Sequence, residues 1–238
     1  MKEAVDEPLF ERTMNDLIHI DPSTTAVLTV DLQRDYLDPT VSTRPVLQSE
    51  ADRVIESTRR LLAFARRLGI SVVHAYATRR QVEIDRGMAF GGLRYILEGQ
   101  AKGLSQNAQV GVQHVPDRVM GSAQAEVHPA LLDEGDLHVS TKKTLDSFLY
   151  SDLDMVLGRM VQPENLLIAG VNTDTCVYST TFSAANRGYR PIVIRDCCAS
   201  MRGIDRHDMA LTLMSRSMAW VFDLDELFDR MGQSADDR

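Results

Sequence analysis

Three side chains of different chemical type stand where predicted β-strands end. Asp31 closes the first apolar run, Lys142 follows a later one, and Cys176 comes just after the run that ends near Gly170. In an open parallel α/β sheet the carboxyl ends of the strands meet at one edge, and active sites lie where the strand order reverses. A carboxylate, an ammonium and a thiol are the components of an activated nucleophile. These three residues are therefore candidates for nucleophilic catalysis by cysteine.

The position of Cys176 adds to this interpretation. It lies in the first turn of a helix predicted at 175–187. Backbone N–H groups and the helix dipole at such a position favour the thiolate, and the positive charge of Lys142 would add to the effect. The same N–H groups can also stabilise an oxyanion.

Each residue taken alone has a purely structural interpretation as well. A single cysteine is commonly part of a buried core, and an aspartate after a strand commonly caps a turn or a helix. Lys142 is followed by Lys143, and adjacent lysines are usually solvated surface residues. Residue types and spacing therefore leave both interpretations open.

The rest of the chain supplies the elements that must position these residues. Apolar runs rich in β-branched residues alternate with segments of helical periodicity, which predicts an α/β fold of three layers, with a mostly parallel six-stranded sheet between helices. The strands are expected at 26–31, 70–76, 137–141, 165–171, 191–196 and 219–223. The helices are expected at 47–68, 151–161, 175–187 and 206–217, with a last one reaching Met231.

The chain of 238 residues suits one domain with a sizeable core. We predict a single domain, 1–238, with an N-terminal extension at 1–22 and a flexible tail at 232–238. The stretch 77–137 is too long for an ordinary connection and is predicted to be an insertion that covers the substrate or contacts another subunit. A helix-like piece, 93–103, lies within it.

Composition and charge argue against several classes of protein. A formal net charge of −8 provides no electrostatic footprint for nucleic acid or for an anionic membrane, and no apolar stretch approaches the roughly 20 residues of a membrane span. Residues 1–22 lack the features of a signal peptide, so we expect a cytoplasmic protein. Three cysteines cannot form a disulfide framework, and the adjacent Cys197 and Cys198 are interpreted as structural or pocket-lining.

Three sequence blocks resemble the isochorismatase-like cysteine hydrolase superfamily. They are Val-Asp-Leu-Gln-Arg-Asp-Tyr at 30–36, Lys-Lys-Thr-Leu-Asp-Ser-Phe at 142–148 and Gly-Val-Asn-Thr-Asp-Thr-Cys-Val at 170–177. The resemblance covers roughly residues 24–230 with the blocks in order, and it implies a Rossmann-like strand order. The family includes nicotinamidases, N-carbamoylsarcosine amidohydrolase, biuret hydrolases, ureidoacrylate hydrolases and true isochorismatases.

The resemblance implies a role for each candidate residue. Asp31 corresponds to the catalytic acid and base, and Cys176 to the nucleophile. Lys142, rather than Lys143, corresponds to the catalytic lysine, because in the family this lysine stands six residues before the phenylalanine, here Phe148.

Further properties of the family are expected to carry over to this chain. They include a non-proline cis peptide at Val171-Asn172 and an oxyanion hole made by the backbone N–H groups of Asn172 and Cys176. Relatives commonly form dimers or tetramers, so a homodimer or homotetramer is expected.

Two departures from the family pattern narrow the chemistry. Nicotinamidases carry an Asp-x-His-x-x-x-His metal cluster that has no counterpart here, so we predict no metal and no cofactor and disfavour nicotinamidase activity. His74 alone is more plausibly a core residue than a ligand. Isochorismatases that cleave a vinyl ether lack the cysteine, so Cys176 disfavours that reaction.

The predicted reaction is hydrolysis of the C–N bond of a small ureido, carbamoyl or amide compound, such as biuret, triuret, an N-carbamoyl amino acid or ureidoacrylate. Tyr36 follows Asp31 at a position that lines the pocket in relatives. Arg202 follows the strand at 191–196, where it either clamps a carboxylate or ureido carbonyl or is a solvated surface residue. A nicotinamidase-type hydrolase, another amide hydrolase of the family and a thiol-redox or non-catalytic protein on the same fold are the alternatives.

Overall fold

The computed structural model describes residues 13–86 and 118–232. Its sheet has six strands in the order β3-β2-β1-β4-β5-β6, and every neighbouring pair is parallel. The predicted six-stranded sheet and Rossmann-like strand order are confirmed, and the sheet is all-parallel rather than mostly parallel. The strands are β1 Thr25–Val30, β2 Ser71–Ala77, β3 Leu137–Lys142, β4 Asn165–Val171, β5 Arg190–Ala199 and β6 Trp220–Phe222.

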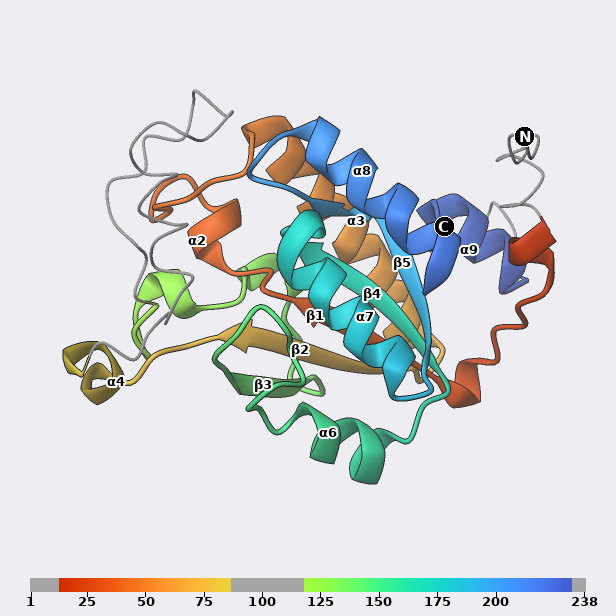
Figure 1. The fold of residues 1–238 in the computed structure, drawn as a ribbon, viewed down its shortest axis with the longest axis horizontal. Coiled ribbons are helices and arrows are strands. Elements are labelled where there is room, and N and C mark those ends of the chain that lie inside the picture. The colour runs from red at the N-terminus through yellow and green to blue at the C-terminus, as the bar shows by residue number, and fades with distance from the viewer. Residues whose placement is uncertain (1–12, 87–117, 233–238) are drawn as a thin grey trace, which may run out of the picture.

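Helices cover both faces of the sheet (Figure 1). Helices α3 (Gln48–Arg67) and α9 (Leu224–Arg230) share one hydrophobic core with side chains such as Val27 and Leu167. Helices α6 (Leu153–Met155), α7 (Tyr178–Asn186) and α8 (Ile204–Ser217) share a second core with Leu28 and Ile168. Consecutive strand residues point to opposite faces, so the uninterrupted apolar runs of β1 and β4 supply both cores. This confirms the three-layer α/β/α prediction.

The predicted helices differ from the structure mainly at their ends. The helix expected at 175–187 begins with a π-helical turn, Thr173–Val177, before α7. The helix expected at 151–161 consists of the short α6 and a π-helical turn at Val156–Val161. Strand β5 continues to Ala199, beyond the predicted end at 196, because the thiols of Cys197 and Cys198 are fully buried and behave as core side chains.

The long connection between β2 and β3 contains short helices where it is described. They are α4 (Gln81–Asp85) and the 3-10 turns Ala123–Ala125 and Pro129–Leu131. The backbone around Val119 pairs with Arg79 just beyond β2, through the bonds Arg79 N–H to Arg118 O (2.9 Å) and Met120 N–H to Arg79 O (2.8 Å). The helix expected at 93–103 and nearly all of the predicted tail lie outside the described residues.

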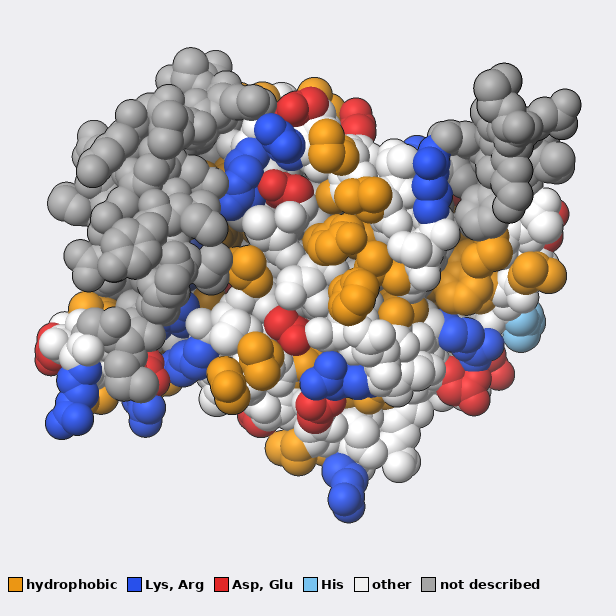
Figure 2. Space-filling view, viewed as in Figure 1, with side chains coloured by type: hydrophobic (Ala, Val, Ile, Leu, Met, Phe, Trp, Pro, Cys, Tyr) orange, Lys and Arg blue, Asp and Glu red, His pale blue; other side chains and the backbone are white. Residues whose placement is uncertain are grey.

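Exposed apolar side chains gather on the outer surface of α7 and α8, near the centre of the view in Figure 2. On these helices Phe182, Ile204, Met209 and Leu213 are each at least half exposed. Within the described residues no helix has the length and apolar character needed to cross a membrane.

Candidate active site

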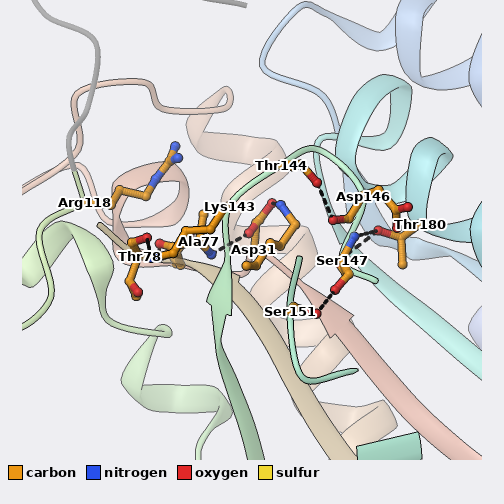
Figure 3. A network of polar contacts seen from close by, with 12 residues as sticks. Asp31, Ala77, Thr78, Arg118, Lys143, Thr144, Asp146, Ser147, Ser151 and Thr180 are labelled. Atoms are coloured by element: carbon orange, nitrogen blue, oxygen red, sulfur yellow. Dashed lines mark hydrogen bonds and ion pairs between the residues drawn. The ribbon is translucent and has the colours of Figure 1, made fainter. Parts of the chain in front are cut away.

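The site lies where the strand order reverses, between β1 and β4. The carboxylate of Asp31 follows β1 directly and is 1% exposed. Its Oδ1 accepts the N–H of Ala77 at 3.0 Å, a bond drawn in Figure 3. Asp31 has a φ of 51°, in the left-handed region that aspartate tolerates better than most residues. This backbone turn, together with the Ala77 bond, fixes the carboxylate at the edge of the sheet.

The ammonium of Lys142 reaches the same carboxylate from the end of β3. Its Nζ lies 2.6 Å from Asp31 Oδ2, and its side chain is 1% exposed. Burial alone would lower the pKa of Lys142, but the Asp31 carboxylate, the hydrogen bond to it and the electrostatic interaction with Cys176 raise the pKa above its ordinary value. The lysine is therefore a permanently charged, buried partner of Asp31.

Lys143 points elsewhere, as strand alternation requires. Its Nζ donates to the carbonyl of Thr78 at 2.8 Å and lies 3.0 Å from Oε2 of Glu83 on α4. Its side chain is 28% exposed. The structure thus brings Lys142, and not its neighbour, to Asp31.

The loop that follows Lys142 is hydrogen-bonded to α7, the helix that follows Cys176. Ser147 donates its N–H to Thr180 Oγ1 on α7 at 3.0 Å, and Thr180 Oγ1 donates to Ser147 Oγ at 2.9 Å (Figure 3). Ser183 Oγ on the same helix donates to Asp146 Oδ2 at 2.6 Å. These hydrogen bonds connect the segment 144–148 to α7. The sequence block that begins with Lys142 is therefore held against the helix that follows Cys176.

Cys176 lies in the π-helical turn after β4 and is 5% exposed. Its thiol interacts electrostatically with Asp31 and Lys142. Burial raises the pKa of Cys176 to about 11 from an ordinary 9.0, and the nearby Lys142 charge lowers it only in part. Lys142 acts on the thiol in the expected direction, because its charge favours the thiolate. Desolvation outweighs this effect, so burial favours the protonated thiol in the resting site.

The segment that leads to Cys176 has the expected cis peptide at Val171-Asn172. The Asn172 carbonyl accepts the N–H groups of Thr175 and Val177, each at 3.1 Å. The Asn172 side chain accepts the N–H of Met201 at 2.8 Å. The nucleophile turn is therefore fixed both by its own backbone and by the loop that follows β5.

Strands β1 and β4 approach each other closely at Gly170. A Cβ added there would lie 2.3 Å from the carbonyl oxygen of Val30 and 2.8 Å from its Cβ. Val30 directly precedes Asp31, and Gly170 precedes the nucleophile turn. A glycine at this position is thus required for the acid and nucleophile segments to lie as close as they do.

Arg202 lies in the loop after β5, as expected, but its guanidinium is engaged by a carboxylate. Its Nη1 lies 3.2 and 3.0 Å from the two oxygens of Asp174, in the nucleophile turn, and the side chain is 22% exposed. Ser200 Oγ also donates to Asp174, at 2.7 Å. Arg202 therefore contacts the nucleophile turn and is not a freely solvated surface arginine.

The family model described as the isochorismatase domain matches residues 25–226. The chain belongs to the isochorismatase-like hydrolase superfamily.

Solved structures show that this isochorismatase-like hydrolase shares its fold with proteins of low sequence identity. A cysteine hydrolase from Pseudomonas syringae has a TM-score of 0.73 at 24% identity, covering 90% of this chain and 95% of its own. An isochorismatase-like hydrolase from Alkaliphilus metalliredigens has a TM-score of 0.65 at 19% sequence identity, and the match covers 87% of this chain and 99% of that hydrolase. N-carbamoylsarcosine amidase from Thermoplasma acidophilum has a TM-score of 0.60 at 20% sequence identity, and the match covers 85% of this chain and 97% of the amidase.

The isochorismatase-like hydrolase also has site residues that the sequence analysis missed. The Arg118 guanidinium lies 4.6 Å from the centre of the Tyr36 ring, and its Nη2 lies 3.0 Å from Asp35 Oδ2. Burial raises the pKa of Tyr36 to about 12, although the charge of Arg118 acts in the opposite direction. Asp35 was visible in the first sequence block, next to Tyr36. Arg118 lies at the far end of the long connection, where no motif indicated it.

Within residues 13–86 and 118–232 the hydrolase has no group of three or more His, Cys, Asp or Glu side chains arranged to hold a metal ion. His74 is fully buried, as expected of a core residue. Its Nδ1 lies 2.7 Å from Thr29 Oγ1, and its Nε2 lies 3.0 Å from Asp136 Oδ2. Asp136 also binds Arg66 at 2.6 Å, so this polar chain joins β1, β2 and α3 and acts in the core.

Proposed function

We propose that the chain is a cysteine-dependent amidohydrolase that cleaves the C–N bond of a small ureido, carbamoyl or amide compound. The observation that carries the proposal is the buried ion pair of Asp31 and Lys142 in the electrostatic surroundings of the Cys176 thiol. The three side chains are at most 5% exposed, the ammonium lies 2.6 Å from the carboxylate, and both charges act on the thiol. A thiol, a base and a fixed positive charge in a dry site are the parts that nucleophilic catalysis requires.

In the first step Asp31 takes the proton of the Cys176 thiol. The pKa of the thiol, about 11, makes this transfer unfavourable in the resting site. It therefore proceeds together with attack of sulfur on the substrate carbonyl, which moves the negative charge from sulfur to the carbonyl oxygen. The backbone N–H groups of Asn172 and Cys176 are proposed to bind that oxygen. Lys142 keeps Asp31 in place and balances the charge.

In the second step the tetrahedral adduct collapses and the C–N bond breaks. Asp31 returns its proton to the leaving nitrogen, which would otherwise depart as a poor leaving group. A thioester or thiocarbamate remains on Cys176. Asp31 then accepts a proton from water as the water oxygen attacks the carbonyl. The C–S bond breaks, the acid product leaves, and Asp31 returns the proton to sulfur, which restores the thiol.

The kind of amide is inferred from the surroundings of the thiol. Tyr36 is 6% exposed and lies within electrostatic range of Cys176 and Asp31, so we propose that it forms one wall of the substrate site. Arg202 is proposed to bind a polar substrate group from the loop after β5. The name of the N-carbamoylsarcosine amidase relative supports carbamoyl compounds as a class. The reaction as proposed uses no metal and no cofactor, and the expected homo-oligomer stays a prediction.

The test is ammonia release by the purified full chain across a panel of ureido, carbamoyl and short-chain amide compounds, with mass spectrometry of the quenched enzyme. A mass increase on Cys176 that equals the acyl or carbamoyl group, and its absence in Cys176→Ala, are expected. Reversible oxidation of Cys176 to a disulfide without any acylation would instead indicate the thiol-redox alternative. Turnover that is lost on chelation and restored by zinc would show a metal site that the proposal lacks.

A further inference from the structure

Arg44 is a buried cation that forms no ion pair with the carboxylates among residues 13–86 and 118–232. Its side chain lies in a residue that is 2% exposed, and its Nε and Nη2 atoms have no hydrogen-bond partner. Burial lowers the pKa of the guanidinium, and the nearby positive charge of Arg118 adds to this effect. An arginine nevertheless stays charged in proteins. A buried charge without a partner is strongly unfavourable, so the position calls for an anion.

The backbone around Arg44 is held firmly in place. Thr43 donates its N–H and its hydroxyl to Asp35 Oδ1, at 2.9 and 2.8 Å. The N–H of Arg44 donates to Ser42 Oγ at 3.2 Å, and the N–H of Val46 donates to the Tyr36 carbonyl at 3.1 Å. The segment 42–46 therefore folds back onto the short helix α2 (Arg34–Leu37), which carries Asp35 and Tyr36. Arg44 is fixed beside Tyr36 rather than free to turn to solvent.

The segment that carries Arg44 packs against the helix that carries Tyr36, through the bond from Val46 N–H to the Tyr36 carbonyl. Tyr36 interacts electrostatically with Cys176 and Asp31, and Arg44 interacts with Tyr36 and Arg118. Arg44 therefore belongs to the group of charges around the proposed wall of the substrate site.

The charges around this wall do not balance. Arg118 has Asp35 at 3.0 Å, Arg202 has Asp174 at 3.0 Å, and Lys142 has Asp31 at 2.6 Å. In the parts of the chain that the structure describes, no ion pair of Arg44 completes this series. Arg44 thus differs from these three cations in having no carboxylate within ion-pair distance there.

We infer that Arg44 binds a carboxylate of the substrate, which makes the substrate an N-carbamoyl or ureido acid rather than a neutral compound such as biuret. Nε and Nη2 form one edge of the guanidinium, where two parallel N–H bonds match the two oxygens of a carboxylate. A single negative charge balances the one unpaired cation. This inference rests on the proposed function and names its substrate class.

The test compares two alkylating agents of similar size, anionic iodoacetate and neutral iodoacetamide, on Cys176. The same thiolate attacks the CH2 carbon of both agents and displaces iodide, so the ratio of their rates is independent of the pKa of the thiol. Arg44→Gln is expected to lower the iodoacetate-to-iodoacetamide ratio by about tenfold or more. Arg59→Gln removes the same charge at an exposed position of α3, where Arg59 is 55% exposed and pairs with Glu56, and should leave the ratio within about twofold. Subtracting the signal of Cys176→Ala removes any reaction of other thiols.

A second arm uses the unmodified protein, so it does not depend on folding of the variant. N-carbamoylglycine should protect Cys176 from iodoacetamide at concentrations at least tenfold lower than the neutral N-carbamoylglycinamide. An unchanged ratio in Arg44→Gln, or equal protection by the two compounds, would overturn the inference. Neither arm requires turnover. Ammonia release from neutral carbamoyl compounds with an unchanged ratio would therefore retain the proposed function and reject the role of Arg44. A lowered ratio without any amide hydrolysis would retain anion binding by Arg44 and reject the proposed function.

Discussion

The Nζ atom of Lys142 lies 2.6 Å from Oδ2 of Asp31, with both side chains fully enclosed, while the next residue in the sequence donates outward to Glu83. One peptide unit thus separates a buried ion pair from a partly exposed one. The pairing identifies the lysine whose charge acts on the reacting groups.

Replacing Lys142 by alanine should lower turnover by a factor on the order of 10²–10³, because one preorganised charge is lost from a desolvated site. Lys143→Ala should stay within a few-fold of the parent, since its ammonium contacts Thr78 and Glu83. The two variants are compared by steady-state kinetics on the same substrate. An inactive Lys143→Ala beside a healthy Lys142→Ala would refute the assignment.

Cys176→Ala should abolish turnover without loss of the fold. Removing one buried sulfur costs little packing, and Cys197 and Cys198 remain fully buried in the core. Circular dichroism and thermal unfolding check the fold, and ammonia release checks activity. Retention of most activity in this variant would contradict a mechanism with sulfur as the nucleophile.

The rate of alkylation of Cys176 by iodoacetamide should increase with pH, with a midpoint near the thiol pKa of about 11. This midpoint is well above the pKa of an ordinary cysteine. Lys142→Ala should move the midpoint higher, because the lysine charge lowers this pKa. The folded-state pKa is raised, so the group's contribution to stability is complete below about pH 9 and is lost as pH rises towards 11. A midpoint at or below that of a free thiol would contradict the raised pKa, and only a midpoint below neutral pH would show that the resting site holds a thiolate.

Asp136→Asn should destabilise the fold at neutral pH by about 2 kcal/mol. Burial alone would raise the pKa of Asp136, but the hydrogen bonds from His74 and Arg66 lower it to about 2 from 3.8. The folded-state pKa is depressed, so this stabilisation is present above about pH 4 and disappears as pH falls through 2. Urea unfolding of both proteins at pH 7 and pH 3 measures the change. A difference that grows on acidification would reject this interpretation.

The sheet and the three central side chains were predictable because they depend on local pattern. Uninterrupted apolar runs mark β1 and β4 as strands that are buried on both faces, and Asp31 and Cys176 follow these two strands. Lys142 ends β3, the partly exposed strand at the edge of the sheet. The lysine register followed from strand alternation and the spacing to Phe148. These properties are written into short stretches of sequence.

The arginines around Tyr36 were not predictable in the same way. Arg118 reaches Asp35 only because the long connection returns to pair beside Arg79, and Arg44 reaches Tyr36 only because 42–46 folds back on α2. Neither contact leaves a periodic signal in the sequence. The protonated state of Cys176 was missed for a related reason: helix dipole and lysine were visible in the pattern, but the degree of desolvation was not.

The near-contact between Gly170 and Val30 has a consequence for redesign of the enzyme. Because main-chain atoms set the spacing between the strand of the acid and the strand of the nucleophile, that spacing does not depend on which side chains surround the substrate. A mutant library for new substrates can therefore vary the partly exposed positions of the segment 42–46, with Gly170 left invariant together with Ser200 and Met201, whose hydrogen bonds hold the turn of Cys176. Variants from such a library would differ in the molecules that they bind, while the distance between the Cys176 sulfur and the Asp31 carboxylate would stay the same in all of them.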